Sequence, residues 1–354
     1  MKNESLSNSI DSNVIANIRF PLMIMIVTIH SFINGVDKNT YPLFWYSQHI
    51  LSEVIGYVAV YAFFFISGYL MFLGVEKYDI QLYKSKLYRR IKNLVIPYLL
   101  WNIIYLIIAI GYTYHKERVL LFQDWNLVDW LKPFYCYGDN SRFPIAGPLW
   151  FVRDLFMIFL LSPFIFISIK RLGIIMPIFC MVLSFSDVIP NVIHVRFSSL
   201  AYVVWGGYFS INKVSVSSLC VKYNKMLLLI YLIVIPVSIW SESTAYAHIV
   251  DNISKFIGVF TLFSVFSLIT VKSRNMWSKC ITDASFYLYA MHLLLIIYCR
   301  EFILTNFKVV SNNNVSLYSI YFSTIVVCIV ICTLTYHISR KISPRFTTLL
   351  TGSR

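Results

Sequence analysis

Charge is scarce in this sequence, and acidic residues are scarcer than basic ones. Asp and Glu number 16 against 30 Lys and Arg, and charged residues make up 13% of the chain against 58% hydrophobic residues. A soluble domain has about 25% charged residues and less than half apolar ones. The composition therefore excludes an ordinary soluble protein and predicts a polytopic integral membrane protein. The apolar runs are long, which favours an all-α fold over the weak alternating pattern of a membrane β-barrel.

Several chemical motifs are also missing. No two of the seven cysteines form a C-x-x-C pair and most lie in apolar runs, so we expect neither a disulfide framework nor a metal site. The chain has no GxxxxGK[ST] loop for nucleotide hydrolysis and no HExxH zinc motif. The polar start, residues 1–13, has no basic segment next to a small-residue cleavage site. We therefore expect the first apolar run to be a retained helix rather than a signal peptide.

Hydropathy predicts about ten transmembrane helices in one domain. The expected spans are 14–33, 50–74, 91–113, 148–169, 172–190, 195–212, 226–241, 249–271, 281–305 and 315–338. Several are shorter than the roughly 20 residues that cross a bilayer upright. The chain shows no internal repeat, and its longest polar connection, residues 114–147, is too short for a separate catalytic module. Residues 1–345 are therefore expected to form a single transmembrane domain.

The basic residues are concentrated in alternate connections. If the N-terminus lies in the cytoplasm, the cytoplasmic connections hold 20 Lys and Arg and the outer connections hold eight. Cytoplasmic connections of membrane proteins carry such an excess. We therefore expect both the N- and C-termini to be cytoplasmic. The same distribution explains the net charge of +14 through membrane orientation, without a nucleic-acid partner.

The first expected span carries an arginine and a histidine, Arg19 and His30, eleven residues apart. Eleven helical steps are about 1100°, three turns plus about 20°, so the two side chains share a face roughly 16 Å apart along the axis. Ionisable groups inside a membrane span are costly and usually functional. The alternative is that Arg19 reaches lipid phosphates and His30 sits unused at the opposite interface.

Five short motifs follow one another along the chain. They are the Arg19/His30 pattern, Phe63–Leu70 (FFFISGYL), Tyr88–Trp101 (YRRIKNLVIPYLLW), Gly147–Leu155 (GPLWFVRDL) and Ser285–His292 (SFYLYAMH). Together they resemble the acyltransferase 3 family, whose members are membrane-embedded O-acyltransferases that modify surface carbohydrates. Each match alone is weak, but in this order they cover nearly the whole chain.

The basic motif departs from the family pattern at one place. The family often shows R-x-x-R there, whereas Arg90 is followed three residues later by Asn93; Lys86 and Arg89 do have that spacing. Which cations take the family's role therefore stays open. The larger variant of the family carries a fused SGNH-type extracellular domain, which we do not expect here.

The resemblance implies a bacterial inner (plasma) membrane enzyme that moves an acyl group from cytoplasmic acyl-coenzyme A (acyl-CoA) to a hydroxyl of a surface polysaccharide or glycolipid. Acetyl-CoA is the expected donor, and no metal is implied. The resemblance makes His30 the catalytic residue. This suits the chemistry, because a base must remove the hydroxyl proton as the oxygen attacks the thioester; an acyl-histidine intermediate is the other route. Arg19 would bind the donor's phosphates, which match a guanidinium in geometry.

Three further residues are candidates for binding the donor. Arg89 and Arg90 lie in a stretch with six basic residues between positions 75 and 92, which also fits a purely topological role. Ser67 lies beside Gly68 in the second expected span, where small residues serve helix packing as readily as ligand binding.

Residues toward the opposite side of the membrane are candidates for the acceptor site. Trp150 fits substrate binding and equally an interfacial aromatic belt. Arg153 fits orientation of the acceptor or of the thioester oxygen. His292 fits a supporting role at the substrate or simple helix packing. Glu53 is a further candidate for orienting His30, although no motif supports it.

A second function class is a transporter or flippase of polysaccharide or glycolipid precursors. It explains hydropathy and charge bias equally well, but it does not explain the alignment of Arg19 and His30 joined to the later motifs, and no inverted repeat is visible. A polysaccharide polymerase would share the large outer loops. Membrane lipids are expected partners in each case.

Overall fold

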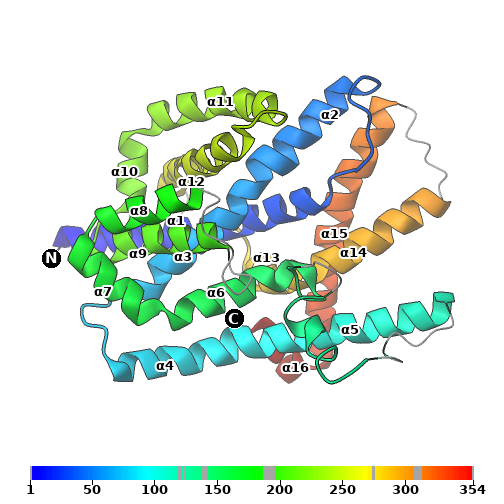
Figure 1. Cartoon of the computed structure of the whole chain (residues 1–354), viewed down its shortest axis with the longest axis horizontal. Helices are drawn as coiled ribbons and strands as arrows, with labels where there is room; N and C mark the ends of the chain where they lie inside the picture. The colour runs from blue at the N-terminus through cyan, green and yellow to red at the C-terminus, as the bar shows by residue number, and fades with distance from the viewer. Residues whose placement is uncertain are drawn as a thin grey trace.

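The chain is helical throughout the part that the structure describes (Figure 1). The structure, a computed structural model, describes residues 2–117, 122, 125–137, 142–185, 196–272, 276–306 and 313–352, and these ranges contain no β-strand. The α-helices are α1 (Lys2–His30), α2 (Pro42–Gln48), α3 (Tyr57–Phe72), α4 (Ile80–Arg90), α5 (Ile96–Glu117), α6 (Trp150–Leu160), α7 (Ser162–Leu172), α8 (Ile175–Phe185), α9 (Phe197–Ile211), α10 (Val216–Lys222), α11 (Asn224–Ser241), α12 (Ala247–Lys272), α13 (Lys279–Asp283), α14 (Ser285–Asn306), α15 (Asn314–Ile342) and α16 (Pro344–Thr351). Two π-helical turns, η1 (His49–Gly56) and η2 (Ile91–Val95), and two 3-10 turns, η3 (Lys132–Phe134) and η4 (Gly147–Leu149), complete them. The all-α prediction is confirmed.

Six helical stretches in the described ranges are long and apolar enough to cross a membrane. They are Ile10–His30, Pro42–Phe72, Ile80–Lys116, Asn224–Ser241, Ala247–Thr270 and Asn314–Ile342. The pair Gly147–Leu160 and Ser162–Leu172, bent by 64°, makes a seventh span if it is counted as one. The remaining expected ranges hold the shorter helices α8 and α9 and the apolar part of α14, Ser285–Tyr298. The protein is thus a multi-pass membrane protein, while the count of ten spans stays a prediction.

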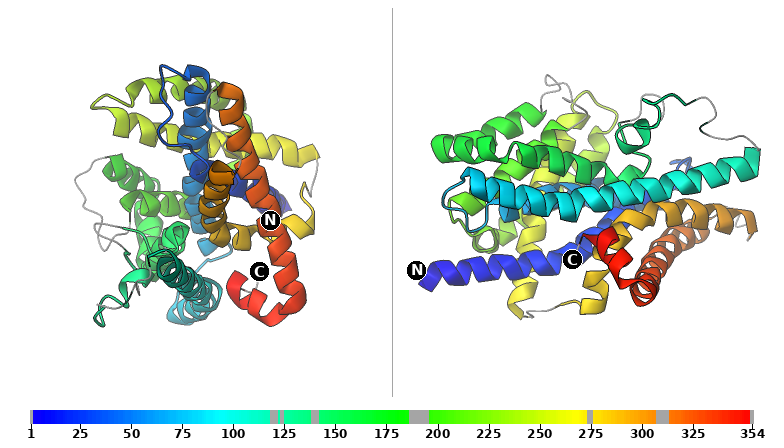
Figure 2. Two further views of the ribbon diagram at one scale, coloured as in Figure 1. Left: turned by 90° about the vertical axis from the view of Figure 1, so that its right-hand side faces the viewer. Right: turned by 90° about the horizontal axis from the view of Figure 1, so that it is seen from below.

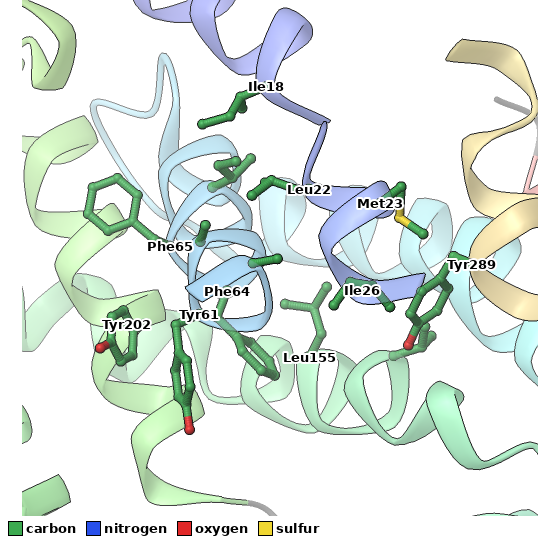
Figure 3. Packing of buried hydrophobic residues seen from close by; sticks show 14 of the residues in the cluster. Ile18, Leu22, Met23, Ile26, Tyr61, Phe64, Phe65, Leu155, Tyr202 and Tyr289 are labelled. Carbon is green, nitrogen blue, oxygen red and sulfur yellow. The ribbon is translucent and has the colours of Figure 1, made fainter. Parts of the chain in front are cut away.

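Helix α1 contains a proline, and its free carbonyl has a partner elsewhere in the chain. Pro21 has no N–H, so the carbonyl of Asn17 four residues earlier loses its helical donor. The indole of Trp277 donates to this carbonyl at 2.8 Å. The ribbon of α1 loosens at this point, between Ile18 and Leu22 (Figure 3). The proline therefore attaches the first helix to the segment that leads into α13.

Helices α3 and α9 touch backbone to backbone through two glycines. A Cβ on Gly68 would lie 2.1 Å from the carbonyl oxygen of Val203, and one on Gly206 would lie 1.9 Å from that of Phe65. Small residues allow this close approach in membrane helices. Gly68 therefore serves packing, and the neighbouring residues Phe64 and Phe65 of α3 are fully buried (Figure 3).

Helices α4 and α5 form one long rod through the π-helical turn η2 (Figure 2). Pro97 lies two residues after this turn, and breaks in the regular helical hydrogen bonding are common near prolines, which have no N–H to donate. The C-terminal helix α16 packs on the start of α5: the indole of Trp101 donates to the carbonyl of Leu350 at 3.1 Å. Gly352, with φ of 70°, ends α16 so close to Asn93 that a Cβ would meet its carbonyl oxygen at 2.3 Å.

The glycine contact gives a test of the packing. We expect Gly68→Ala to lower the free energy of unfolding by about 1–3 kcal/mol, because the new methyl group meets rigid backbone. Gly111→Ala is the matched control: it lies in α5 with nothing within 4 Å of the new Cβ. That change should be neutral or stabilising by up to about 1 kcal/mol through helix propensity. Thermal unfolding of both variants in detergent checks this, and equal melting temperatures would contradict the packing role.

Candidate active site

A single cavity of about 980 Å³ runs along the second half of α1. Its walls come from α1, α3, η2, α6 and the segment from Trp277 to Tyr289. Met23 and Ile26 of α1 face Leu155 of α6 and Tyr289 of α14 in this region (Figure 3). Most of the lining is apolar, and the few polar groups gather at the two ends, as in many ligand sites.

The two ends of the cavity differ in their charged residues. The Arg19 end is lined by Asn17, Arg19, Arg90, Asn93, Lys279 and Asp283. The His30 end is lined by His30, Tyr57, Phe143, Trp150 and Arg196. Both names refer to positions in the cavity and not to the sides of the membrane.

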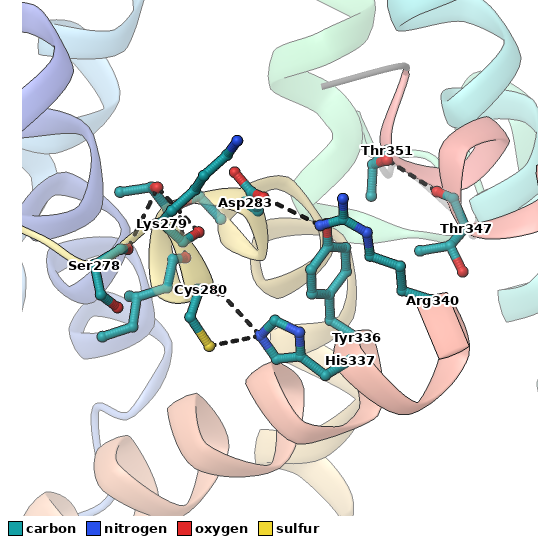
Figure 4. A network of polar contacts seen from close by, with 12 residues as sticks. Ser278, Lys279, Cys280, Asp283, Tyr336, His337, Arg340, Thr347 and Thr351 are labelled. Atoms are coloured by element: carbon teal, nitrogen blue, oxygen red, sulfur yellow. Dashed lines mark hydrogen bonds and ion pairs between the residues drawn. The ribbon is translucent and has the colours of Figure 1, made fainter. Parts of the chain in front are cut away.

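Three cations and one carboxylate line the Arg19 end. Asp283 is paired with Arg340 of α15, whose Nη1 lies 3.1 Å from the Asp283 Oδ2 (Figure 4). Tyr336 supports the same guanidinium with its hydroxyl at 3.3 Å. Arg340, which does not line the cavity, neutralises the carboxylate of Asp283. The Arg19 end therefore keeps the positive charge of Arg19, Arg90 and Lys279.

The structure separates the two neighbouring arginines of the basic motif. Arg90 is half-buried, lines the cavity and lies over the ring of Phe159, with its Cζ 5.7 Å from the ring centre. Arg89 is exposed, does not line the cavity and donates to the Ser85 Oγ at 3.3 Å. Neighbouring residues on a helix point about 100° apart, so only one of them faces the site.

His30 lines the cavity, and a second histidine lies directly behind it. The ring centre of His292 is 5.0 Å from that of His30, and His292 is fully buried. The Nδ1–H of His292 donates to the carbonyl of Tyr289 at 2.7 Å, because a carbonyl can only accept. This contact assigns the tautomer and leaves the Nε2 of His292 as an acceptor, which has no partner in the described part of the chain.

The end of α1 that carries His30 is held by side chains from the next span. The Ser52 hydroxyl donates to the carbonyl of Thr28 at 2.9 Å. Just beyond the helix, Gln48 accepts from the backbone N–H of Ile33 at 3.1 Å and donates to its carbonyl at 3.3 Å. These bonds satisfy one carbonyl in the last turn of α1 and the backbone of Ile33 just after it, and so help to fix the position of the imidazole.

Two further predicted residues lie on the cavity wall. Ser67 lines the cavity, whereas its neighbour Gly68, about 100° further around α3, packs on α9. Trp150 lines the His30 end, and the guanidinium of Arg196 lies 4.4 Å from its ring centre. One face of the tryptophan is therefore covered by a cation.

The comparison with known families agrees with this arrangement. The sequence profile of the acyltransferase 3 family, described as an acyltransferase domain, matches residues 13–334, nearly the whole of the 354-residue chain. The chain belongs to the acyltransferase 3 family. No curated protein and no solved structure matches it. Membership supports a membrane acyltransferase, and the cavity is where the residues of the matched motifs meet.

Like Arg89, the predicted substrate ligands Arg153 and His292 do not line the cavity of this acyltransferase. The Nε and Nη2 of Arg153 donate to the Asp154 Oδ1 at 3.1 and 2.9 Å, and its Nη1 donates to the carbonyls of Tyr135 and Arg142 at 2.7 and 3.0 Å. The guanidinium thus ties the loop before α6 to the helix. A direct contact of Arg153 with substrate stays a prediction, as does a role for Glu53, which is exposed and does not line the cavity.

Several residues that line the cavity were not predicted from the sequence. Lys279 and Arg196 entered only as charges counted for orientation, and Asn17, Tyr57 and Trp277 had no role assigned. A proline four residues after Asn17, inside an apolar span, is the one signal that pointed to a special contact there. Lys279 and Arg196 lie just at or before the start of a helix, where no periodic pattern predicts which way a side chain faces.

The buried ion pair of α6 gives a second prediction. We expect Arg153→Met to lower the free energy of unfolding by about 3–5 kcal/mol, because it leaves the fully buried carboxylate of Asp154 without its counter-ion. Arg142→Met is the matched control: it lies in the same loop, its side chain is exposed, and only its backbone carbonyl takes part in the contact. It should change stability by less than about 0.5 kcal/mol. Thermal unfolding measures both, and a stable Arg153→Met protein would contradict the structural role.

Proposed function

We propose that this acyltransferase transfers an acetyl group from cytoplasmic acetyl-CoA to a hydroxyl of a surface polysaccharide or lipid-linked glycan in a bacterial cell membrane. One observation carries the proposal: a single cavity joins three cations at one end to an imidazole at the other. Acetyl-CoA has the complementary form, with phosphates at one end and the thioester at the tip of a long flexible arm. The family supports acyl transfer in general, and the cavity supplies a matching path.

In this proposal the Arg19 end faces the cytoplasm and receives the phosphates of the donor. Guanidinium groups bind phosphate oxygens in a bidentate fashion, and Lys279 adds a point charge. The 20-to-8 distribution of Lys and Arg supports this orientation. It also supports cytoplasmic termini and an even number of spans, about ten in this proposal. The pantetheine arm then lies between α1, α3 and α6, among apolar side chains that exclude water.

At the His30 end the acceptor hydroxyl meets the thioester. The imidazole of His30 takes the hydroxyl proton as the acceptor oxygen forms a bond to the thioester carbonyl carbon. The carbon–sulfur bond then breaks, the sulfur leaves as the CoA thiolate, and the proton held by His30 passes to that sulfur. The products are an O-acetyl ester and CoA-SH, and the imidazole returns to its starting state.

His292 acts in this proposal as a positioning residue. Its ring centre is 5.0 Å from that of His30, with the two rings tilted by 47°, and the carbonyl of Tyr289 assigns its tautomer. In this proposal an N–H of His30 turns to the unused Nε2 of His292 when substrate is bound, and the other nitrogen of His30 then presents its lone pair to the cavity. A second imidazole does this without placing a carboxylate charge in an apolar site.

The catalytic role of His30 is tested in cells and in vitro. We expect His30→Ala to abolish transfer of labelled acetyl groups from acetyl-CoA, while the exposed His248→Ala keeps wild-type activity. Surface polysaccharide from a deletion strain should lose ester-linked acetyl groups, and only the wild-type and His248→Ala genes should restore them. Full activity of a well-expressed His30→Ala protein would remove the mechanism. Loss of the polysaccharide itself, with no change in its esters, would favour a transporter.

The neighbouring arginines test the donor end. We expect Arg90→Gln to weaken binding of CoA to the purified protein by about tenfold, because it removes a bidentate phosphate ligand from the cavity wall. Arg89→Gln is the matched control, since it changes the same charge one residue away on the exposed face. Isothermal titration in lipid nanodiscs measures both affinities. Equal effects of the two changes would assign the basic stretch a topological role only.

A further inference from the structure

The His30 end of the cavity contains a cation that the proposed acyl transfer does not use. Arg196 lies directly before α9, and its backbone N–H donates to the Asp154 Oδ2 at 3.3 Å. This bond fixes the backbone of Arg196 beside α6, where its side chain lines the cavity together with His30 and Tyr57.

The guanidinium of Arg196 lies over two aromatic rings. Its Cζ is 4.4 Å from the ring centre of Trp150 and 5.8 Å from that of Phe143. A guanidinium that lies against a ring keeps its N–H donors in its own plane, where they fit the two oxygens of a carboxylate or phosphate. Within the ranges that the structure describes, no carboxylate forms an ion pair with the side chain of Arg196.

Two other cations near this part of the molecule are already neutralised. The ammonium of Lys255 is paired with Asp251 and lies 5.4 and 5.3 Å from the ring centres of Tyr57 and Tyr61. Arg153 is paired with Asp154 and bonded to loop carbonyls. Among the described residues at this end, Arg196 is thus the cation that both reaches the cavity and forms no ion pair of its own, since the nearby carboxylate of Asp154 is paired with Arg153.

We propose that Arg196 binds an oxyanion of the acceptor, a carboxylate or a phosphate next to the hydroxyl that is acylated. The acceptor is therefore an anionic glycan, such as one with a uronic acid or a phosphodiester-linked sugar. This inference rests on the proposed function, which places the acceptor at the His30 end. The donor does not need Arg196, because Arg19, Arg90 and Lys279 serve its phosphates at the other end of the cavity.

Binding of three amphiphilic probes that differ in charge tests the site. Octyl β-glucuronide carries a carboxylate, octyl phosphate carries a phosphate, and octyl β-glucoside is neutral; each is titrated into the intact protein in nanodiscs. We expect the wild type to bind at least one anionic probe about tenfold more tightly than the neutral one. Arg196→Gln should remove this preference, and Arg196→Lys should keep part of it, because lysine preserves the charge but not the planar fork.

Two controls separate this inference from the proposed function. Arg142→Gln, which removes an exposed arginine outside the cavity, should keep the anion preference. CoA should bind to Arg196→Gln as tightly as to the wild type. A tighter glucuronide assigns a sugar carboxylate, and a tighter octyl phosphate assigns a phosphate.

The opposite outcomes overturn the inference in distinguishable ways. Equal binding of all three probes to the wild type, or an anion preference that survives in Arg196→Gln, removes the anion site while leaving the donor site intact. A loss of CoA binding in Arg196→Gln moves Arg196 to the donor. Failure of CoA to bind the wild type contradicts the proposed function itself.

Discussion

The arrangement of the site depends on one backbone carbonyl in the first helix. Pro21 deprives the Asn17 carbonyl of its helical donor, and the indole of Trp277 replaces that donor. In an apolar environment an unsatisfied carbonyl costs several kcal/mol, so the proline makes a replacement donor for the Asn17 carbonyl necessary. It joins two segments about 260 residues apart in the chain and sets Lys279, two residues beyond the indole, on the wall of the cavity.

The two functional ends of α1 are fixed by different parts of the chain. Before the proline, Arg19 is positioned by the contact with the segment that leads into α13. After it, His30 is positioned by bonds from the second span, in which Ser52 holds Thr28 and Gln48 holds Ile33. A straight helix would fix the separation of the two side chains by itself. Here the separation also depends on how two distant segments pack against α1, so the cavity is a property of the assembled fold.

Periodicity in the sequence was enough to predict the helices and the relation of Arg19 to His30, because the spacing of eleven residues survives the local bend and both side chains line the cavity. It was not enough to choose between Arg89 and Arg90, since that depends on how α4 is rotated where it meets the π-helical turn η2. Arg153 was predicted as a substrate ligand, and its loop partners could not be predicted because they come from irregular backbone. The sequence did not indicate Arg196 for the same reason. The position of its side chain depends on the ring of Trp150 and the carboxylate of Asp154, both on another helix.

The charges of the cavity follow from its place in an apolar surrounding. Among the described residues that line it, Asp283 is the single carboxylate, and Arg340 neutralises it from outside. The ring that lies next to His30 is that of another imidazole, His292. A carboxylate there would have to be desolvated in every state without a permanent counter-ion, whereas a neutral imidazole supplies an acceptor at much lower cost. Within the described part of the chain, cations that form no ion pair remain at the two ends of the cavity, and in the proposed function the anionic groups of the donor and the acceptor pair with them.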